Sequence, residues 1–439
     1  MRFLITLLTT IVAIATTTAQ TTKERIFLDP RLAGGIYRPY PTEFKAQTPA
    51  PKGYEAFYIS HYGRHGSRFI EFNKEFDMIL SIFENAAQQN MLTAFGKETY
   101  DKLLAAGKIC QGRAGDLTPL GITQHEQIAT RMVENHPSIF RKAPEVTAIS
   151  TTVPRCLISM NAFTNQLIRL NPDVNISLLD TGHPYMPILN PLSGVRTTPL
   201  AKRVDKYRWP HAEWVKEWDA FRDKHIDNSR MLSALFEAEF IPMIENVELF
   251  SMYLFRNIAS FGGTPASHID FSEVFTKDEI YRWWRVINIR SYLERGNSGI
   301  GGGFLSEIAD VLVYHFLTEA QQKVAAGKPA VSLRFGHDGC IMCMLGAMGI
   351  TGWAQRVDNW EEVEDVCCDF TIPMGCNFQW IFYRHKKSGE VLVKMMLNEE
   401  ELELPLQSDV APYYRWADVE AYCKDCLADS TLYKFDLTK

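Results

Sequence analysis

The segment Tyr54-Glu-Ala-Phe-Tyr-Ile-Ser60 leads through His61-Tyr62-Gly63 into Arg64-His65-Gly66-Ser67-Arg68. Its first seven residues are mostly apolar and rich in aromatic side chains, which predicts a short buried strand ahead of a loop. Gly66 allows that loop to turn sharply and to approach a ligand closely. The segment therefore predicts a strand that brings two guanidiniums and one imidazole to an edge of a sheet.

The order strand, polar loop, helix recurs along the chain. Strand signals at 54–60, 145–150 and 330–335 are each followed by helical signals, at 72–89, 157–170 and 340–348. This alternation predicts an α/β fold with a mostly parallel sheet flanked by helices. A further hairpin is expected from 378–384 and 391–397. In such folds ligands bind beyond the carboxyl ends of the strands, where the polar loops lie.

The middle of the chain differs from both ends. Residues 181–315 are rich in helical signals: Trp214, Trp218, Phe221 and His225 share one helix face, and Thr276 with Glu279 forms a capping box. We expect a helical subdomain at 181–315, inserted between the two parts of one α/β domain, 20–180 and 316–439. The tryptophans are more consistent with a core than with a sugar-binding platform.

The N-terminus has the pattern of a secretory signal. Arg2 precedes an apolar run, and small residues end at Ala19. Residues 1–19 are therefore expected to be cleaved as a signal peptide, which predicts a periplasmic or secreted protein. An N-terminal membrane anchor is the alternative. No later segment is apolar and long enough to cross a bilayer, so no membrane association of the mature chain is expected.

Composition excludes several classes of protein. The chain has 439 residues, of which 46% are hydrophobic and 22% charged, and a formal net charge of −6. These values are ordinary for a globular protein and argue against disorder. A mildly acidic chain is a poor candidate for binding nucleic acid, although a small anion can bind where positive charge gathers locally.

Nine cysteines leave at least one thiol without a partner in the chain. The pairs Cys340-x-x-Cys343 and Cys423-x-x-Cys426 lie too far apart in the sequence for an ordinary zinc ribbon. Buried thiols, or one or two disulfides permitted by export, are the better interpretations. No metal is expected.

Three loops carry residues suited to phosphate chemistry. Arg64 and Arg68 offer planar forks that match phosphate oxygens, and their charge lowers the pKa of His65, which favours the nucleophilic neutral imidazole. His337 and Asp338 follow the third strand, and Arg155 follows the second. Taken alone, the first loop is equally consistent with a basic surface segment. Glu71 and Lys74 are candidates for the entrance of such a site.

Together these motifs resemble the histidine phosphatase superfamily, in the branch of acid phosphatases, phytases and multiple inositol polyphosphate phosphatases. The hallmark Arg-His-Gly-x-Arg stands at Arg64–Arg68, and the C-terminal His-Asp at His337-Asp338. The segments 116–121, 154–163 and 393–400 are similar to further family motifs. The similarity covers most of the chain in the expected order and is weakest in the helical insertion.

The resemblance implies a role for each matching residue. His65 is the expected nucleophile, forming a phosphohistidine intermediate, and Asp338 the expected proton donor to the leaving alcohol. The phosphoryl oxygens are expected to be bound by Arg64, Arg68, Arg155 and His337. No cofactor is implied, because arginines supply the positioning and charge that phosphoryl transfer needs.

The resemblance also leaves choices open. Phe69-Ile70 follow Arg68 where the family often has a proline two residues on, and Gly339 follows Asp338 where inositol polyphosphate phosphatases typically carry His-Ala-Glu. The expected substrate is a small phosphate ester, with phytate or a lower inositol phosphate ahead of a sugar phosphate or broad acid phosphatase activity. A non-catalytic phosphate-ester-binding protein and a phosphoryl mutase are the remaining alternatives.

Overall fold

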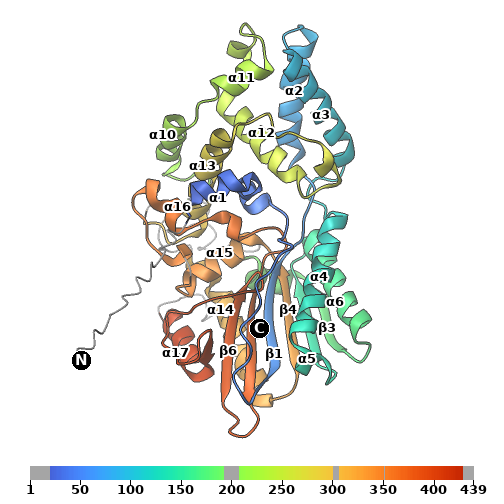
Figure 1. Ribbon diagram of the computed structural model, residues 1–439, viewed down its shortest axis with the longest axis vertical. Helices are drawn as coiled ribbons and strands as arrows, with labels where there is room; N and C mark the ends of the chain where they lie inside the picture. Colours follow the sequence, from blue (N-terminus) through green and yellow to red (C-terminus); the bar gives the residue numbers. More distant parts are fainter. Residues whose placement is uncertain (1–19, 192–206, 300–305, 351, 429–439) are drawn as a thin grey trace, which may run out of the picture.

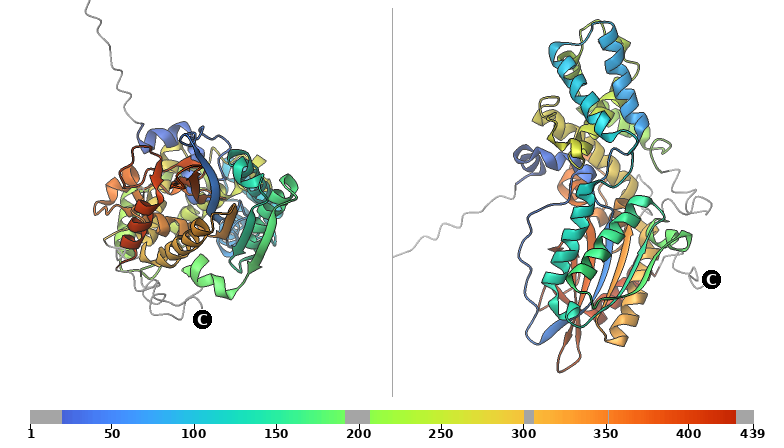
Figure 2. Two further views of the ribbon diagram at one scale, coloured as in Figure 1. Left: turned by 90° about the horizontal axis from the view of Figure 1, so that it is seen from below. Right: turned by 90° about the vertical axis from the view of Figure 1, so that its right-hand side faces the viewer.

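The computed structural model describes residues 20–191, 207–299, 306–350 and 352–428. The molecule is elongated, with a β-sheet in its lower half and a group of helices above it (Figures 1 and 2). The expected signal peptide at 1–19 lies outside the described residues. Among the helices that are described, none combines the length and apolarity needed to cross a membrane.

The sheet is mixed, and its strand order is β3-β2-β4-β1-β5-β6-β7, with β8 beside β6. The strands are β1 (Tyr54–Arg64), β2 (Glu145–Ser150), β3 (Asn175–Thr181), β4 (Ala330–Gly336), β5 (Asn377–His385), β6 (Val391–Leu397), β7 (Glu400–Glu401) and β8 (Tyr413–Arg415). The first four in spatial order pair in parallel, and the hairpin β5–β6 adds the antiparallel part. The predicted fold class and hairpin are therefore confirmed.

Strand register places three loops at one edge of the sheet. Arg64 pairs with Gly336, and Ser150 pairs with Phe335, so β1, β2 and β4 end at the same level. β1 runs four residues beyond the predicted end at Ser60, because β4 and β5 pair with it on both sides as far as Arg64 and Gly63. The loop Arg64–Arg68 thus starts in the centre of the sheet.

Helices cover both faces of the sheet. α4 (Pro119–Asn135), α5 (Pro137–Phe140) and α6 (Pro154–Leu170) lie on one face, and α14 (Asp310–Ala326) and α17 (Trp416–Cys426) on the other (Figure 1). α15 (Asp338–Ala347) continues from β4. α6 begins three residues earlier than predicted, because Pro154 is well suited to a first helical position, where no N–H is needed.

A helical cap, residues 73–110 and 215–295, stands above the sheet edge (Figure 1). It contains α2 (Asn73–Gln88), α3 (Ala94–Cys110), α10 (Val215–His225), α11 (Ser229–Leu235), α12 (Val247–Phe261) and α13 (Lys277–Arg295). α2 packs on α12 and α3 packs on α11. The expected insertion at 181–315 thus supplies only part of the cap, and α2 and α3, from the first α/β segment, supply the rest.

Local predictions in the cap hold. Trp214 and Trp218 are each 1% exposed, which confirms that they belong to a core. Thr276 and Glu279 form the expected capping box at the start of α13. All nine cysteines are free thiols, and seven are buried. Burial rather than bridging is therefore how this structure accommodates its cysteines.

Candidate active site

The six side chains expected to carry chemistry share one cavity of about 410 Å³ between the sheet edge and the helical cap. They are Arg64, His65, Arg68, Arg155, His337 and Asp338. Glu71 also lines this cavity, whereas Lys74 lies over the ring of Phe72, 5.7 Å from its centroid. Residues separated by more than 270 positions in the chain therefore meet at the end of β1.

His65 is held with one ring nitrogen free for chemistry. Its Nδ1 lies 2.9 Å from the carbonyl oxygen of Gly66, which only accepts, so Nδ1 carries the proton and Nε2 keeps its lone pair. Burial lowers the pKa of His65 well below 6.5, and the charges of Arg155 and Arg64 lower it further. The imidazole is neutral and nucleophilic through Nε2 over a wide pH range.

Two arginines that line the cavity have buried Nε atoms. Arg64 is 1% exposed, and its Nη1 donates to the carbonyls of Ile36 and Ile372 at 2.6 and 3.0 Å. The Nε atoms of Arg64 and Arg155 are buried and find no hydrogen-bond partner among the described residues. Buried cations with incomplete hydrogen bonding are costly, and an anion in the cavity would stabilise both guanidiniums.

Arg68 is bound to a carboxylate. Its Nη1 donates to the carbonyl oxygen of Phe69, and its Nη2 lies 2.9 Å from Oε2 of Glu71. Burial raises the pKa of Glu71, but the positive charges of Arg68 and Arg256 outweigh it, and the net pKa is lowered. Glu71 therefore stays ionised and offsets part of the positive charge of the cavity.

The loop after β4 brings a second imidazole and a carboxylate. The ring of His337 lies edge-on to that of His65, with centroids 5.7 Å apart. Asp338 opens α15, and its Oδ2 is 3.5 Å from Nη2 of Arg64. Burial raises the pKa of Asp338, but Arg64 and Arg295 outweigh it and hold the pKa below its usual range. Burial and Arg155 lower the pKa of His337 to about 4.

Four further arginines line the same cavity, and the sequence patterns did not reveal them. Arg256, Arg290 and Arg295 belong to the cap, and Arg208 precedes its second segment. Glu294 lies between two of them, 3.3 Å from Arg290 and 3.0 Å from Arg295. Seven arginines face three carboxylates there (Glu71, Glu294 and Asp338), so the cavity is strongly positive inside an acidic protein.

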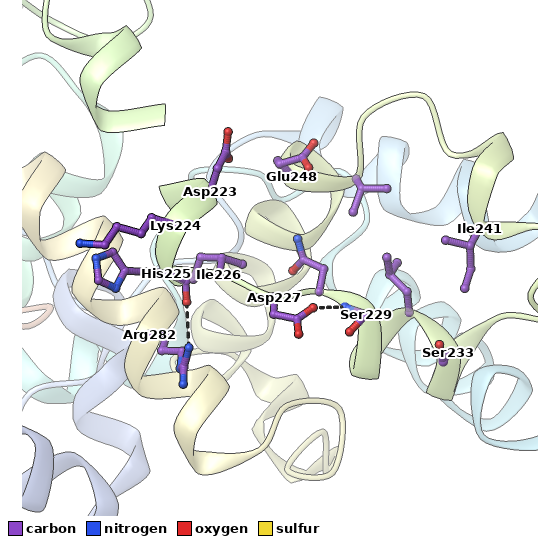
Figure 3. Close-up of a pocket in the computed structure, with 13 residues that line it drawn as sticks. Asp223, Lys224, His225, Ile226, Asp227, Ser229, Ser233, Ile241, Glu248 and Arg282 are labelled. Carbon is purple, nitrogen blue, oxygen red and sulfur yellow. Dashed lines mark hydrogen bonds between the residues drawn. The ribbon is translucent and has the colours of Figure 1, made fainter. Parts of the chain in front are cut away.

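A larger cavity, about 560 Å³, lies in the cap among α10, α11 and α12 (Figure 3). Charged groups that line this cavity make hydrogen bonds that stabilise the surrounding helices. Asp227 accepts from the backbone N–H of Ser229 at the start of α11, and Arg282 donates to the carbonyl oxygen of His225 (Figure 3). Size alone therefore does not identify the site, and the chemistry favours the smaller cavity.

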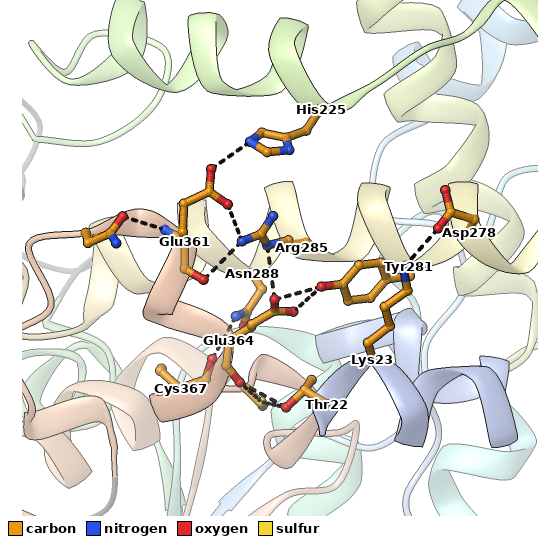
Figure 4. A network of polar contacts seen from close by, with 12 residues as sticks. Thr22, Lys23, His225, Asp278, Tyr281, Arg285, Asn288, Glu361, Glu364 and Cys367 are labelled. Atoms are coloured by element: carbon orange, nitrogen blue, oxygen red, sulfur yellow. Dashed lines mark hydrogen bonds and ion pairs between the residues drawn. The ribbon is translucent and has the colours of Figure 1, made fainter. Parts of the chain in front are cut away.

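A polar network fixes the helix that carries two of the cap arginines (Figure 4). Arg285 of α13 pairs with Glu361 at 2.5 Å and with Glu364 at 3.3 Å, and the hydroxyl of Tyr281 donates to Glu364. Thr22 of α1 (Thr22–Leu28) donates to the carbonyl oxygen of Glu364. These contacts anchor α13 through Tyr281 and Arg285, and Arg290 and Arg295 of the same helix line the cavity.

A family model described as the histidine phosphatase superfamily (branch 2) matches residues 63–398. The match spans more than half of the chain and includes all six predicted site residues. The chain belongs to this superfamily. It is accordingly a phosphoric monoester hydrolase, and the predicted family and enzyme class are confirmed. No curated protein sequence matches the chain.

Solved structures show the same fold at low identity. A multiple inositol polyphosphate phosphatase from Bifidobacterium longum, in complex with inositol hexasulfate, has a TM-score of 0.76 and 18% identity, covering 88% of this chain and 96% of its own. A phytase from D. castellii has a TM-score of 0.64 and 14% identity, with 91% and 86% covered. A phytase from Klebsiella sp. ASR1 has a TM-score of 0.55 and 10% identity, with 85% and 96% covered.

Proposed function

We propose that the protein hydrolyses phosphomonoesters by double displacement through a phosphohistidine at His65. Nε2 attacks phosphorus as the P–O bond to the alcohol breaks, and Asp338 donates its proton to the departing oxygen. Water then attacks the phosphohistidine, giving a proton back to Asp338 and releasing inorganic phosphate. The observation that carries this proposal is that His65, three arginines and the carboxyl group of Asp338 line one cavity.

The arginines supply the electrostatic part of the mechanism. Arg64, Arg68, Arg155 and His337 line the cavity beside His65. There the charges of the three arginines and a hydrogen bond from His337 would stabilise the phosphoryl oxygens in the transition state. A bound phosphate also screens Asp338 from Arg64, which raises the affinity of this carboxyl group for a proton. Asp338 therefore becomes protonated when substrate is bound, and activity should be highest at acidic pH.

The substrate class that we favour is the inositol polyphosphates, from phytate to its lower esters. A monophosphate uses only Arg64, Arg68, Arg155 and His337 and leaves the rest of the positive cavity unused. A ring with several phosphates would also reach Arg290 and Arg295, two cations that share the single carboxylate of Glu294. The Bifidobacterium longum phosphatase of similar fold was crystallised with inositol hexasulfate, which is consistent with this class.

Export is part of the proposal. Residues 1–19 have the signal pattern, and the first described helix begins at Thr22, capped by Thr21. Cleavage before Gln20 would leave that cap intact. N-terminal sequencing of the mature protein should therefore begin at Gln20, and a chain that keeps residues 1–19 in the membrane fraction would contradict this part.

The deciding experiment compares the wild type with His65→Ala. Phosphate release would be measured from phytate, glucose 1-phosphate and p-nitrophenyl phosphate across the acidic to neutral range, with and without EDTA. We expect activity in the wild type only, the highest kcat/KM on phytate, and no effect of the chelator. Activity that survives in the variant rules out the nucleophile, and equal kcat/KM on all three esters rules out the substrate preference.

A further inference from the structure

We infer that Gln124 is a positioning residue, which aligns the loop of His65 and Arg68 by binding the residue between them. Gln124 lies on α4, and its Oε1 accepts from the backbone N–H of Ser67 at 2.8 Å. Its Nε2 donates to the hydroxyl of the same serine at 2.9 Å. One side chain thus holds both the backbone and the side chain of Ser67. This inference rests on the proposed role of His65 as nucleophile.

The contact between Gln124 and Ser67 is buried. Gln124 is 4% exposed and Ser67 is fully buried. The loop passes so close to α4 that a Cβ added at Gly66 would lie 2.4 Å from the carbonyl oxygen of Gly121. Without Gln124, the buried N–H of Ser67 would lose its hydrogen-bond partner, which is costly away from bulk solvent.

Neighbouring contacts restrain other parts of the loop but leave this role to Gln124. Thr118 donates to the carbonyl oxygen of Ser67, and Ser159 accepts from the N–H of Gly66 at 3.2 Å. His65 itself is bound through its backbone to Gly336 and Gly375. Among the described residues, only Gln124 is recorded as binding the N–H and hydroxyl of Ser67.

The chemistry explains why alignment matters here. The N–H of Ser67 lies one residue before Arg68 and two after His65, so a shift of Ser67 moves both relative to phosphorus. A displacement near 1 Å from productive geometry can cost about 100-fold in rate. Arg155 and His337 come from other segments, and the guanidinium of Arg64 is held by the carbonyls of Ile36 and Ile372. These three phosphate donors keep their places, so binding of inorganic phosphate should change little.

The test compares Gln124→Leu, Gln124→Glu and a control, Gln166→Leu. Leucine removes both hydrogen bonds, and glutamate restores them because its two oxygens accept from the N–H and the hydroxyl of Ser67. Gln166 is a half-buried glutamine of α6 that donates to Thr130, away from the cavity. The assays are kcat and KM with p-nitrophenyl phosphate, the inhibition constant of inorganic phosphate, and amide-hydrogen exchange of the peptide that contains Ser67.

We expect Gln124→Leu to lower kcat about 10- to 100-fold with less than about a threefold change in phosphate inhibition. Gln124→Glu should recover most of kcat near neutral pH and lose it earlier on acidification, because the new charge raises the pKa of His65. The control should match the wild type. Exchange at Ser67 should accelerate only in the leucine variant.

Two results would overturn the inference: a leucine variant with wild-type kcat, or a glutamate variant as slow as the leucine variant with a normal pH profile. A fall in melting temperature with unchanged kcat also opposes it, because that outcome indicates a purely structural role. If the wild type is inactive or His65→Ala is fully active, the proposed function fails instead. In that case, amide-hydrogen exchange at Ser67 still shows whether Gln124 holds this residue in place.

Discussion

The carboxylate of Asp338 lies 3.5 Å from the guanidinium of Arg64, and both belong to the same cavity as His65. The pair joins the proposed proton donor to a proposed phosphate ligand. In the empty site Arg64 keeps Asp338 ionised, whereas a bound phosphate competes for the same guanidinium. Proton delivery and phosphate binding are therefore coupled through one contact.

Asp338→Asn should separate the proton donor from the rest of the site. The amide keeps the shape but cannot protonate an alkoxide, so kcat on phytate should fall about 100- to 10,000-fold. p-Nitrophenolate leaves without help, so kcat on its ester should fall far less. Steady-state kinetics on both substrates check this, and equal losses would assign Asp338 a role other than that of the acid.

Arg290→Gln should affect only substrates that reach the cap. A hydrogen bond to a charged group is worth about 1.5–3 kcal/mol, so KM for phytate should rise about 10- to 100-fold while KM for p-nitrophenyl phosphate stays unchanged. Arg282→Gln is the matched control, because Arg282 lies on the same helix and pairs with Asp278 outside the cavity. A similar rise in KM for both esters would remove the argument for a polyphosphate.

Gly66→Ala should lower kcat, whereas Gly112→Ala should lower only the stability of the fold. A Cβ at Gly66 meets the backbone of Gly121 at 2.4 Å, so the loop must move, and kcat should drop at least about tenfold. Gly112 has φ +70° and nothing within 4 Å of the added atom. It should lose only about 1–2 kcal/mol of stability and keep its kcat. Thermal melts and p-nitrophenyl phosphate assays distinguish the two outcomes.

Buried histidines should make the protein less stable in acid. Burial lowers the pKa of His125 and His136 to about 3 and of His315 and His337 to about 4, and it lowers those of His61 and His65 well below 6.5. Below 6.5 the unfolded chain therefore binds more protons than the folded one, and stability falls as pH falls towards 4.

Three carboxyl groups oppose this trend in part. Burial raises the pKa of Asp369 to about 6 and those of Glu75 and Glu364 above their usual value, so the folded state gains protons there as pH falls. Six histidines outweigh them, and the net direction remains destabilising. Denaturant unfolding at a series of pH values checks the slope, which His125→Phe should reduce by up to about 1.4 kcal/mol per pH unit. A stability that rises from pH 6.5 to 4 would contradict the burial of neutral imidazoles.

The central residues of the candidate site could be predicted because their sequence signals are local. Arg64, His65 and Arg68 stand in five consecutive residues, and His337 and Asp338 are adjacent. Each group directly follows a strand whose apolar run is easy to recognise. Parallel pairing then brings those strand ends together, so the fold class was enough to predict that the loops meet.

The cap arginines and Gln124 carry no such signal. Arg290 lies among other charged residues of α13, where an arginine facing a cavity looks like one facing solvent. Arg256 is a single arginine in the mostly apolar α12, and no neighbouring motif marks it. Gln124 lies one turn inside α4, and only the close approach of Gly66 and Gly121 shows what it binds. These positions depend on how helices pack across the molecule, which periodicity within one helix does not specify.

The cap is built from two separate segments of the chain, and this limits how the protein can be shortened. Phe76 and Phe83 of α2 pack against three aromatic rings: those of Phe250 and Phe261 in α12, and that of Phe236, directly after α11. Removing 181–315 to obtain a minimal phosphatase would expose the apolar faces of α2 and α3 beside the loop that carries His65. Redesign of substrate choice therefore has to exchange side chains within the cap, because the cap cannot be detached as a module.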